Sequence, residues 1–217
     1  MTSYDLIVFD WDGTLMDSTA VITLAVQNAC ADLGLPVPSH KDASHVIGLG
    51  LRDALLHVAP TLKSVDYPKM SERYVHHFRA NEENMPLFDG AQAMLEKLHG
   101  DGYLVAIATG KSRNGLDRAL EKAGIGEYFH SSRCADECYS KPHPEMLHEL
   151  MQQFNVSPQR TLMIGDTTHD LQMAINAETD GLAVTYGAHP KHELQQLNPI
   201  GLIDDIKEFA PWLAMRV

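Results

Sequence analysis

The chain has 217 residues, of which 44% are hydrophobic, and its formal net charge is −12 at pH 7. A chain of this length can bury a substantial core, as one large domain or two small ones. The negative charge disfavours nucleic acid and anionic membranes as partners, because both repel an acidic surface. An anionic substrate would need local positive charge, from a metal ion or from a few Lys and Arg side chains.

The cysteines and the apolar runs bear on the compartment. The three cysteines are an odd and sparse set, interpreted as free thiols in a reducing compartment. Cys134 and Cys138 lack the paired clusters of a zinc site. No apolar run approaches the roughly 18 residues that span a bilayer. The first strand is expected almost at the N-terminus, which leaves no room for a signal peptide, so we expect a cytoplasmic protein.

The first element along the chain is the apolar run Leu6–Phe9, interpreted as a buried strand. No convincing strand follows between about Ser18 and Met85, where the sequence instead indicates helices. These predicted helices are Thr19–Leu33, Leu51–Val58 and Pro68–Asn84. Pro and Gly in the stretch Met85–Ala91 indicate a hinge at its end. We therefore predict a helical insert directly after the first strand.

Beyond the insert, strands and helices alternate. The predicted strands are Leu104–Ala108, Thr161–Ile164, Leu182–Thr185 and, more weakly, Ile200–Ile203. The predicted helices are Ala91–Leu98, Gly115–Ala123 and Glu145–Phe154. Short, almost continuously apolar strands that alternate with helices are typical of a parallel sheet with both faces covered. The predicted fold class is therefore α/β, with a doubly wound parallel sheet.

Polar residues follow three of these strands. They are Asp10 and Asp12 after the first, Thr109-Gly110-Lys111-Ser112 after the second, and Gly165-Asp166-Thr167-Thr168-His169-Asp170 after the third. Ligands of an open parallel sheet bind beyond the carboxyl ends of its strands, so the three sets should converge on one crevice. At least three carboxylates in one place repel one another, and burial adds a desolvation cost. We expect Mg²⁺ to compensate, because it prefers oxygen ligands and usually takes one or two carboxylates, waters and a phosphate.

The spacing of Asp10 and Asp12 indicates more than metal binding. Residues i and i+2 share one face of a strand. Where the strand becomes a loop, however, one carboxylate can point at a substrate while the other approaches from another side. This arrangement suits a nucleophile paired with a general acid/base. A carboxylate that attacks phosphorus gives an aspartyl-phosphate, and Mg²⁺ would reduce the charge repulsion between the two groups.

Four separated motifs resemble those of the haloacid dehalogenase superfamily, in its helical-cap phosphatase branch, which includes phosphoglycolate-phosphatase-like enzymes. The motifs are FDWDGTLMDS from Phe9, IATGKS from Ile107, SKPHPEM from Ser140 and MIGDTTHD from Met163. Each motif alone is a weak to moderate signal, but all four occur in the family's order. The resemblance implies a Rossmann-like catalytic core of residues 1–17 and 87–217. It also implies an α-helical cap domain of residues 18–86, which closes over the site and excludes water.

The resemblance also implies catalytic roles. Asp10 would be the nucleophile, and Asp12 would protonate the leaving alcohol and later activate the hydrolytic water. Thr109 and the backbone N–H of Gly110 would hold the transferring phosphoryl group. Lys141 would neutralise the charge on that group and on Asp10. A plainer interpretation is that Thr109 or Ser112 caps the start of the next helix, which is compatible with anion binding at a helix N-terminus.

The same resemblance implies a set of metal ligands. Asp166 would bind Mg²⁺ together with the Asp10 carboxylate and the Asp12 backbone carbonyl. Asp170 would bind the metal or orient its ligands. Without a metal, Asp166 would simply cap the next helix, and Asp170, one turn later, would face solvent.

Three other residues have open roles. Arg52, in the insert, could contact a second anionic group of the substrate, although a surface arginine explains it equally well. Lys111 could cap a helix or contact substrate. His189, on a loop at the same edge of the sheet, could line the entrance.

The leading functional hypothesis is a Mg²⁺-dependent phosphatase, active as a monomer or homodimer, that hydrolyses a small phosphorylated metabolite. A phosphosugar mutase of the β-phosphoglucomutase type would need the same motifs. A phosphoacceptor signalling module is the alternative of another class. It is disfavoured because such modules are about half this length, lack the helical insert, and have no use for the acid/base Asp12. A dehalogenase is disfavoured because that branch needs neither the second aspartate nor Mg²⁺.

Overall fold

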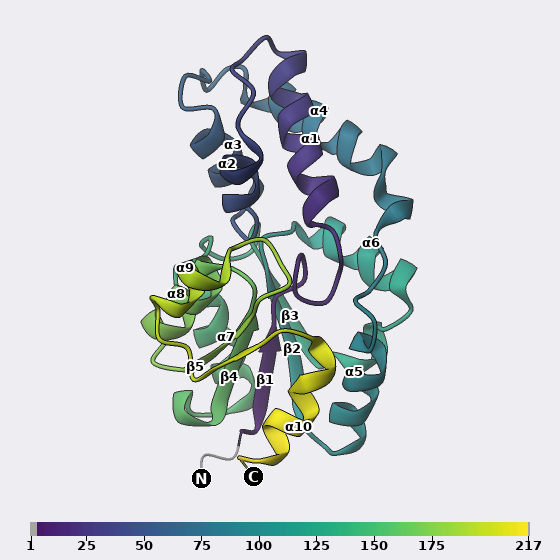
Figure 1. The fold of residues 1–217 in the computed structure, drawn as a ribbon, viewed down its shortest axis with the longest axis vertical. Coiled ribbons are helices and arrows are strands. Elements are labelled where there is room, and N and C mark those ends of the chain that lie inside the picture. The colour runs from purple at the N-terminus through teal and green to yellow at the C-terminus, as the bar shows by residue number, and fades with distance from the viewer. Residues whose placement is uncertain (1–3, 217) are drawn as a thin grey trace.

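The computed structural model describes residues 4–216, which form an α/β core with a helical layer above it (Figure 1). The core contains one sheet of six parallel strands in the order β3-β2-β1-β4-β5-β6. The strands are β1 (Leu6–Phe9), β2 (Leu104–Thr109), β3 (Ser131–Cys134), β4 (Thr161–Gly165), β5 (Asp180–Val184) and β6 (Gly201–Ile203). The predicted α/β class with a parallel sheet is confirmed.

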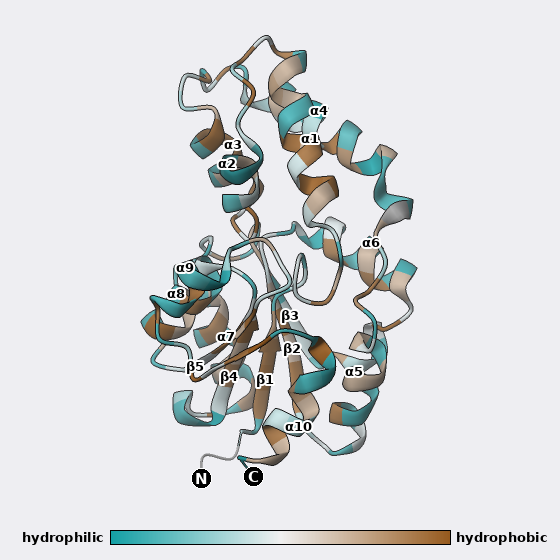
Figure 2. Ribbon diagram, viewed as in Figure 1, coloured by the Kyte–Doolittle hydropathy of each residue, from teal (hydrophilic) through white to brown (hydrophobic). Residues whose placement is uncertain are grey.

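Both faces of the sheet are covered by helices. On one face lie α5 (Ala91–Gly100), α6 (Arg113–Ala123) and α10 (Phe209–Ala214), and on the other α7 (Glu145–Phe154) and α8 (Thr168–Asn176), with the short α9 (Lys191–Gln195) beside α8. Along β1, Ile7 and Phe9 pack into the first layer, whereas Leu6 and Val8 pack into the second. A strand buried on both faces must be apolar at every position, as the brown colour of the central strands in Figure 2 shows. This is why four consecutive apolar residues predicted β1 correctly.

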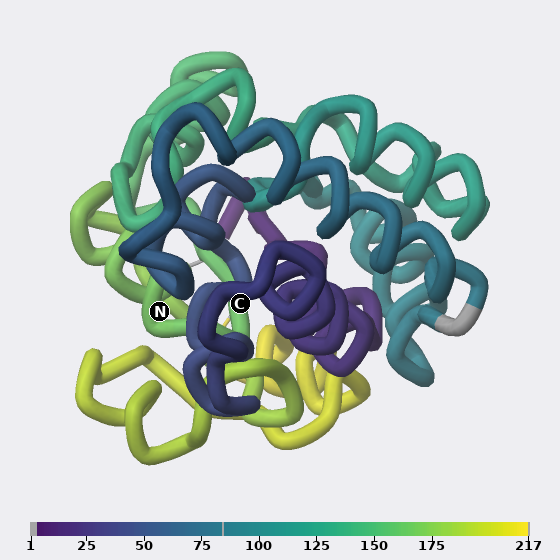
Figure 3. Tube along the Cα trace, turned by 90° about the horizontal axis from the view of Figure 1, so that it is seen from above, coloured from purple at the N-terminus to yellow at the C-terminus, as the bar shows by residue number. Residues whose placement is uncertain are grey.

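Four helices form the layer above the sheet (Figures 1 and 3). They are α1 (Thr19–Asp32), α2 (His40–His45), α3 (Leu51–Val58) and α4 (Tyr67–Ala80). Helices α1, α3 and α4 enclose an apolar cluster of their own, which includes Cys30, Leu55 and Met70. The described residues of the insert contain no strand, so its helical character is confirmed. The exact division into residues 18–86 and the two core segments stays a prediction.

The two connections between the core and this helical layer lie side by side. The backbone N–H of Asp17 donates to the Pro86 carbonyl at 2.9 Å, and that of Phe88 donates to the Leu15 carbonyl at 3.0 Å. Met16 and Leu87 form an antiparallel bridge between these two bonds. Both crossings therefore meet at one short paired segment, and rotation there would move the helical layer as one body.

Some elements were not predicted. Strand β3 has the sequence SSRC, which contains no apolar run because β3 is an edge strand with a single neighbour. Helix α2 is polar and six residues long, and its start is fixed by Ser39, whose hydroxyl accepts from the Asp42 N–H. The helix expected over Pro68–Asn84 ends at Ala80. Single 3₁₀ turns lie at Glu82–Asn84, Gly126–Tyr128, Pro158–Arg160 and Ile206–Glu208.

Within residues 4–216, every helix is too short or too polar to cross a bilayer.

Candidate active site

The sheet order brings the predicted site residues together. β1 lies between β2 and β4, and Phe9 is in register with Ile107 and Ile164. The residues that follow these three strands therefore emerge at one edge. Asp10, Thr109 and Asp166 are all fully buried there, under the helical layer. The predicted convergence of the three motifs is seen in the structure.

A buried lysine lies between two of the carboxylates. Lys141 Nζ is 2.7 Å from Asp10 Oδ1 and 2.7 Å from Asp170 Oδ1. Burial alone would lower the pKa of Lys141, but Asp10 and Asp170 outweigh it and raise that pKa above its usual value. Lys141 is therefore charged, and it holds the two carboxylates in place.

Asp166 is fixed by a different set of contacts. Its Oδ1 accepts from the Thr14 hydroxyl at 2.8 Å, and its Oδ2 accepts from the Ala188 N–H at 2.7 Å. Burial and the neighbouring Asp170 raise the pKa of Asp166 to about 7, while the Ala188 and Thr14 hydrogen bonds and the Lys141 charge oppose this rise. Gly13 is required close by: its φ is +82°, and a Cβ there would lie 2.2 Å from Asp166 Oδ2.

The arrangement fits a cation. Asp10, Asp166 and Asp170 each offer a carboxylate oxygen, and these oxygens lie within 4.8 Å of one another. Asp10 Oδ2 has no hydrogen-bond partner among residues 4–216, and Oδ1 has only its ion pair with Lys141. Burial, then Asp170 and Asp166, raise the pKa of Asp10 well above its usual range against the opposing Lys141 charge. Three buried carboxylates and one lysine leave an excess of negative charge that a divalent oxygen-seeking ion would balance.

The Asp170 carboxylate accepts more hydrogen bonds than those of Asp10 and Asp166. Its Oδ2 accepts from the N–H and the hydroxyl of Thr167, at 3.0 Å and 2.6 Å, in the capping box that begins α8. Its Oδ1 is engaged by Lys141. Asp170 is buried rather than solvent-facing. Its contacts suit a residue that orients Lys141 and the metal site.

Asp12 points to a separate group of partners. Its Oδ1 accepts from the Ser18 hydroxyl at 2.7 Å, and its Oδ2 lies 3.0 Å from Lys111 Nζ. Lys111 Nζ also lies 4.7 Å from the centre of the Phe78 ring, on helix α4. Asp10 and Asp12 are thus held by different lysines, as two carboxylates with different tasks would be.

The loop after β2 lies directly under the helical layer. Thr109 Oγ1 accepts from the Lys111 N–H at 3.2 Å. A Cβ on Gly110 would lie 2.4 Å from the Leu49 carbonyl oxygen and 2.6 Å from that of Gly48. Gly50 N–H donates to the Ser140 hydroxyl at 2.8 Å. The segment 46–50 is therefore docked on the core, and the structure shows the helical layer closed over the site.

A cavity of about 290 Å³ adjoins Asp12 and the Gly110–Lys111 loop. Its other walls come from α1, α3, α4, α6 and the segment 46–51. It therefore lies between the helical layer and the core, beside the Asp12 side chain.

Arg52 is placed away from this cavity. It is exposed on α3, and its guanidinium lies 5.0 Å from the centre of the Tyr67 ring. The cationic residues that line the cavity are instead Lys111, Arg79 and Arg118.

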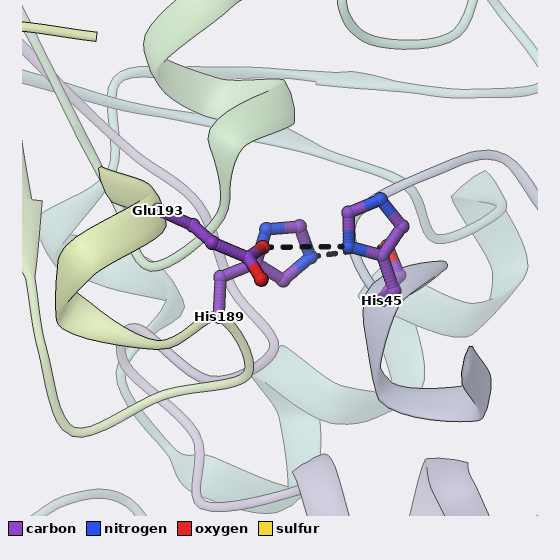
Figure 4. Close-up of side chains that lie close together, drawn as sticks. All are labelled: His45, His189 and Glu193. Carbon is purple, nitrogen blue, oxygen red and sulfur yellow. Dashed lines mark hydrogen bonds and ion pairs between the residues drawn. The ribbon is translucent and has the colours of Figure 1, made fainter. Parts of the chain in front are cut away.

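His189 lies at the contact between the helical layer and the core rather than in the cavity (Figure 4). Its Nδ1 accepts from the Thr168 N–H at 3.0 Å, so its Nε2 carries the proton and donates to the His45 carbonyl at 3.0 Å. The rings of His189 and His45 stack with centres 4.5 Å apart. Burial lowers the pKa of His189 to about 4, with His169 contributing, so the ring is neutral at pH 7. His189 therefore helps to fasten α2 to the core.

Several site residues were not predicted from the sequence. Ser18, Thr14 and Thr167 each donate a hydroxyl to one of the aspartates. All three lie within the motifs, so their place in a motif was the available signal. The Ala188 N–H had no such signal, because its role depends on the path of the loop after β5.

Comparison with known proteins agrees with this geometry. The family model for haloacid dehalogenase-like hydrolases matches residues 7–184. The chain is 34% identical to a probable phosphatase, IndB, from Dickeya dadantii, over 94% of this chain and 90% of that protein. It is 29% identical to a phosphoglycolate phosphatase from Agrobacterium fabrum, over 96% and 91% of the two chains. The crystal structure of a predicted phosphoglycolate phosphatase from Haemophilus somnus superposes with a TM-score of 0.84 at 26% identity, covering 100% of both chains.

Proposed function

Since the chain belongs to the haloacid dehalogenase-like hydrolases, we propose that it is a Mg²⁺-dependent phosphatase acting on a small phosphorylated metabolite through an aspartyl-phosphate. Its relatives are named as phosphatases, and two of them as phosphoglycolate phosphatases, one of these by prediction. The enzyme is therefore a phosphatase of phosphoglycolate-phosphatase-like type. The observation that carries the mechanism is the buried Asp10, whose Oδ2 has no hydrogen-bond partner among residues 4–216.

In the first step, an oxygen of Asp10 attacks phosphorus, and the bond from phosphorus to the ester oxygen breaks. Asp12 gives its proton to the departing alkoxide. Lys141 stays beside Asp10 and balances charge on the phosphoryl group, which Thr109 and the Gly110 N–H hold.

In the second step, Asp12 takes a proton from water, and that water attacks the phosphorus of the aspartyl-phosphate. The bond between Asp10 and phosphorus breaks, which releases inorganic phosphate and regenerates the Asp10 carboxylate. Asp12 can serve both steps because its partners, Ser18 and Lys111, are not shared with Asp10, Asp166 or Asp170.

The proposed metal ligands are Asp10, Asp166 and the Asp12 backbone carbonyl, with Asp170 orienting the site. Bound Mg²⁺ would supply positive charge that lets a dianionic phosphate approach a carboxylate.

We further propose that residues 18–86 act as a cap domain on the core of residues 1–17 and 87–217. We also propose that the protein is cytoplasmic.

Two other functions remain as hypotheses. A phosphosugar mutase would use the same residues and return the phosphoryl group to a sugar. A phosphoacceptor module would keep the phosphoryl group on Asp10, but Asp12 with its two dedicated partners would then have no task.

Phosphate release from a panel of phosphorylated metabolites, with Mg²⁺ and with EDTA, tests the proposal. The panel contains phosphoglycolate, hexose phosphates, nucleoside monophosphates and pyrophosphate. We expect repeated turnover of at least one member that requires Mg²⁺. Isomerisation of a sugar phosphate without phosphate release would favour the mutase, and a single stoichiometric phosphorylation would favour the phosphoacceptor module.

A further inference from the structure

The cavity beside Asp12 bears on which leaving group the enzyme accepts. Asp12 is proposed to protonate the leaving alcohol, so the space next to it is where that alcohol lies. The walls from the helical layer are mostly apolar or aromatic: Ile22 and Val26 from α1, Ile47 and Leu49 from the docked segment, and Tyr74 and Phe78 from α4. Ala54 of α3 closes the cavity on another side.

The cavity is large for a two-carbon leaving group. Roughly 10–15 Å³ of such space holds one water molecule, whereas this cavity measures about 290 Å³. The helical layer is closed in this structure, so the space persists when the segment 46–50 is docked on the core. A glycolate leaving group would leave most of it without contacts.

The lysine beside Asp12 is already engaged, and the two arginines that line the cavity are exposed to solvent. Lys111 is already paired with Asp12 at 3.0 Å. Arg79 and Arg118 are exposed, and Arg118 lies 3.8 Å from Glu82. A carboxylate next to the scissile bond would have to compete for Lys111 or be buried against apolar walls, which is costly.

We propose that the leaving alcohol of the natural substrate carries an uncharged, apolar alkyl or aryl body of several carbons, which fills this cavity. The inference rests on the proposed function and refines it. Burying such a body against Val26, Ala54 and Phe78 provides binding energy that the two-carbon acid of phosphoglycolate does not. Phosphoglycolate would then be a poorer substrate than a longer, uncharged monoester.

Calorimetric binding of phosphonates to the Mg²⁺-loaded protein tests this without requiring turnover. The series is ethyl-, butyl- and hexylphosphonate, with phosphonoacetate as the charged two-carbon comparison. About 0.8 kcal/mol per buried methylene corresponds to about fourfold per carbon, so we expect butylphosphonate to bind about 15-fold more tightly than ethylphosphonate. Equal affinities along the series, or tightest binding of phosphonoacetate, would overturn the inference.

A cavity-filling variant localises the effect. Ala54→Leu should weaken hexylphosphonate binding by about tenfold or more and leave ethylphosphonate within about twofold. Ala31→Leu makes the same change at an exposed position of α1 outside the cavity and should alter neither. If Ala54→Leu does not fold, Val26→Ala takes its place and should weaken butylphosphonate about fourfold or more by removing wall contacts. Unchanged affinities in the folded variant would refute this location of the leaving group.

Turnover of the matching alkyl phosphates separates this inference from the proposed function. Tight, chain-length-dependent binding without phosphate release would support the cavity and contradict the phosphatase mechanism. Phosphate release at one rate for all chain lengths, with equal phosphonate affinities, would support the phosphatase and contradict the apolar leaving group.

Discussion

At the scale of single residues, two different lysines form the ion pairs with the aspartates of the site. Lys141 contacts Asp10 and Asp170 in the buried cluster, whereas Lys111 forms an ion pair with Asp12. A carboxylate used as a nucleophile must stay ionised, and one used as an acid/base must exchange its proton with substrate or water. Different neighbours allow the two aspartates to behave differently although they are two residues apart.

Asp10→Asn tests the nucleophile. The amide has nearly the same shape but cannot form an aspartyl-phosphate, so we expect kcat to fall by at least about 10³-fold. Steady-state phosphate release on the best substrate measures this. Asp17→Asn, an isosteric change at an exposed aspartate of the same motif, serves as the control and should stay near wild type. Retention of wild-type hydrolysis by Asp10→Asn would rule out this residue as the nucleophile.

The excess of buried negative charge predicts that Mg²⁺ stabilises the fold. A ligand at about 100 times its Kd adds about 2.7 kcal/mol to the free energy of unfolding. For a chain of this size, that corresponds to a rise in Tm of about 5–10 °C. Thermal unfolding with Mg²⁺ and with EDTA measures it.

Asp166→Asn removes one proposed metal ligand and should abolish most of the Mg²⁺-induced rise in Tm. Asp180→Asn, a change outside the site, should leave that rise in Tm as it is in the wild type. A Mg²⁺-induced rise that is the same in Asp166→Asn and in the wild type would place the metal elsewhere.

At the scale of elements, the helical layer presents backbone atoms to the loop after β2. Gly110 meets the carbonyl oxygens of Gly48 and Leu49, and neither can rotate away as a flexible side chain would. The close approach of the segment 46–50 therefore explains why position 110 is a glycine.

Gly110→Ala should hold that segment away from the site. Gly110 does not have a positive φ, so alanine is compatible with its own backbone. We expect kcat/KM to fall by about 10²-fold, since displacements near 1 Å can cost that much, while the free energy of unfolding changes little. Gly100→Ala, with no atom within 4 Å of the added Cβ, is the control. Unchanged kcat/KM in Gly110→Ala would show that catalysis does not need the docked segment.

The helices and strands differ in how well the sequence predicted them. Buried strands such as β1 and β4 were recognisable because both faces of the sheet require apolar residues. Strand β3 and helix α2 lack that pattern, since one lies at the sheet edge and the other is short and polar. In the site, the aspartates and lysines of the motifs were recognisable, whereas the hydrogen bonds from Thr14, Ser18 and Thr167 were not predicted. The Ala188 N–H and the position of Arg52 depend on the folded path of the chain and could not be found.

At the scale of the whole molecule, this acidic protein places two lysine side chains beside the aspartates of one closed site. The net charge is −12, yet Lys141 lies within contact distance of Asp10, and Lys111 within contact distance of Asp12. The helical layer contributes most of the apolar walls of the cavity beside Asp12. In the proposed mechanism, the core would carry the phosphoryl chemistry, and the helical layer would determine which alcohol can depart.

The most direct test of this account is to trap the phosphoryl group on Asp10. In Asp12→Asn, an aryl phosphate with a good leaving group can still phosphorylate Asp10, because its phenolate needs no proton, but the hydrolytic water is not activated. After mixing with Mg²⁺ and p-nitrophenyl phosphate and an acid quench, we expect the intact protein to gain the mass of one phosphoryl group, mapped by peptide analysis to Asp10. The added mass should be absent from an Asp10→Asn/Asp12→Asn double variant. A phosphoryl group on another residue, or equal labelling of the double variant, would contradict the central claim.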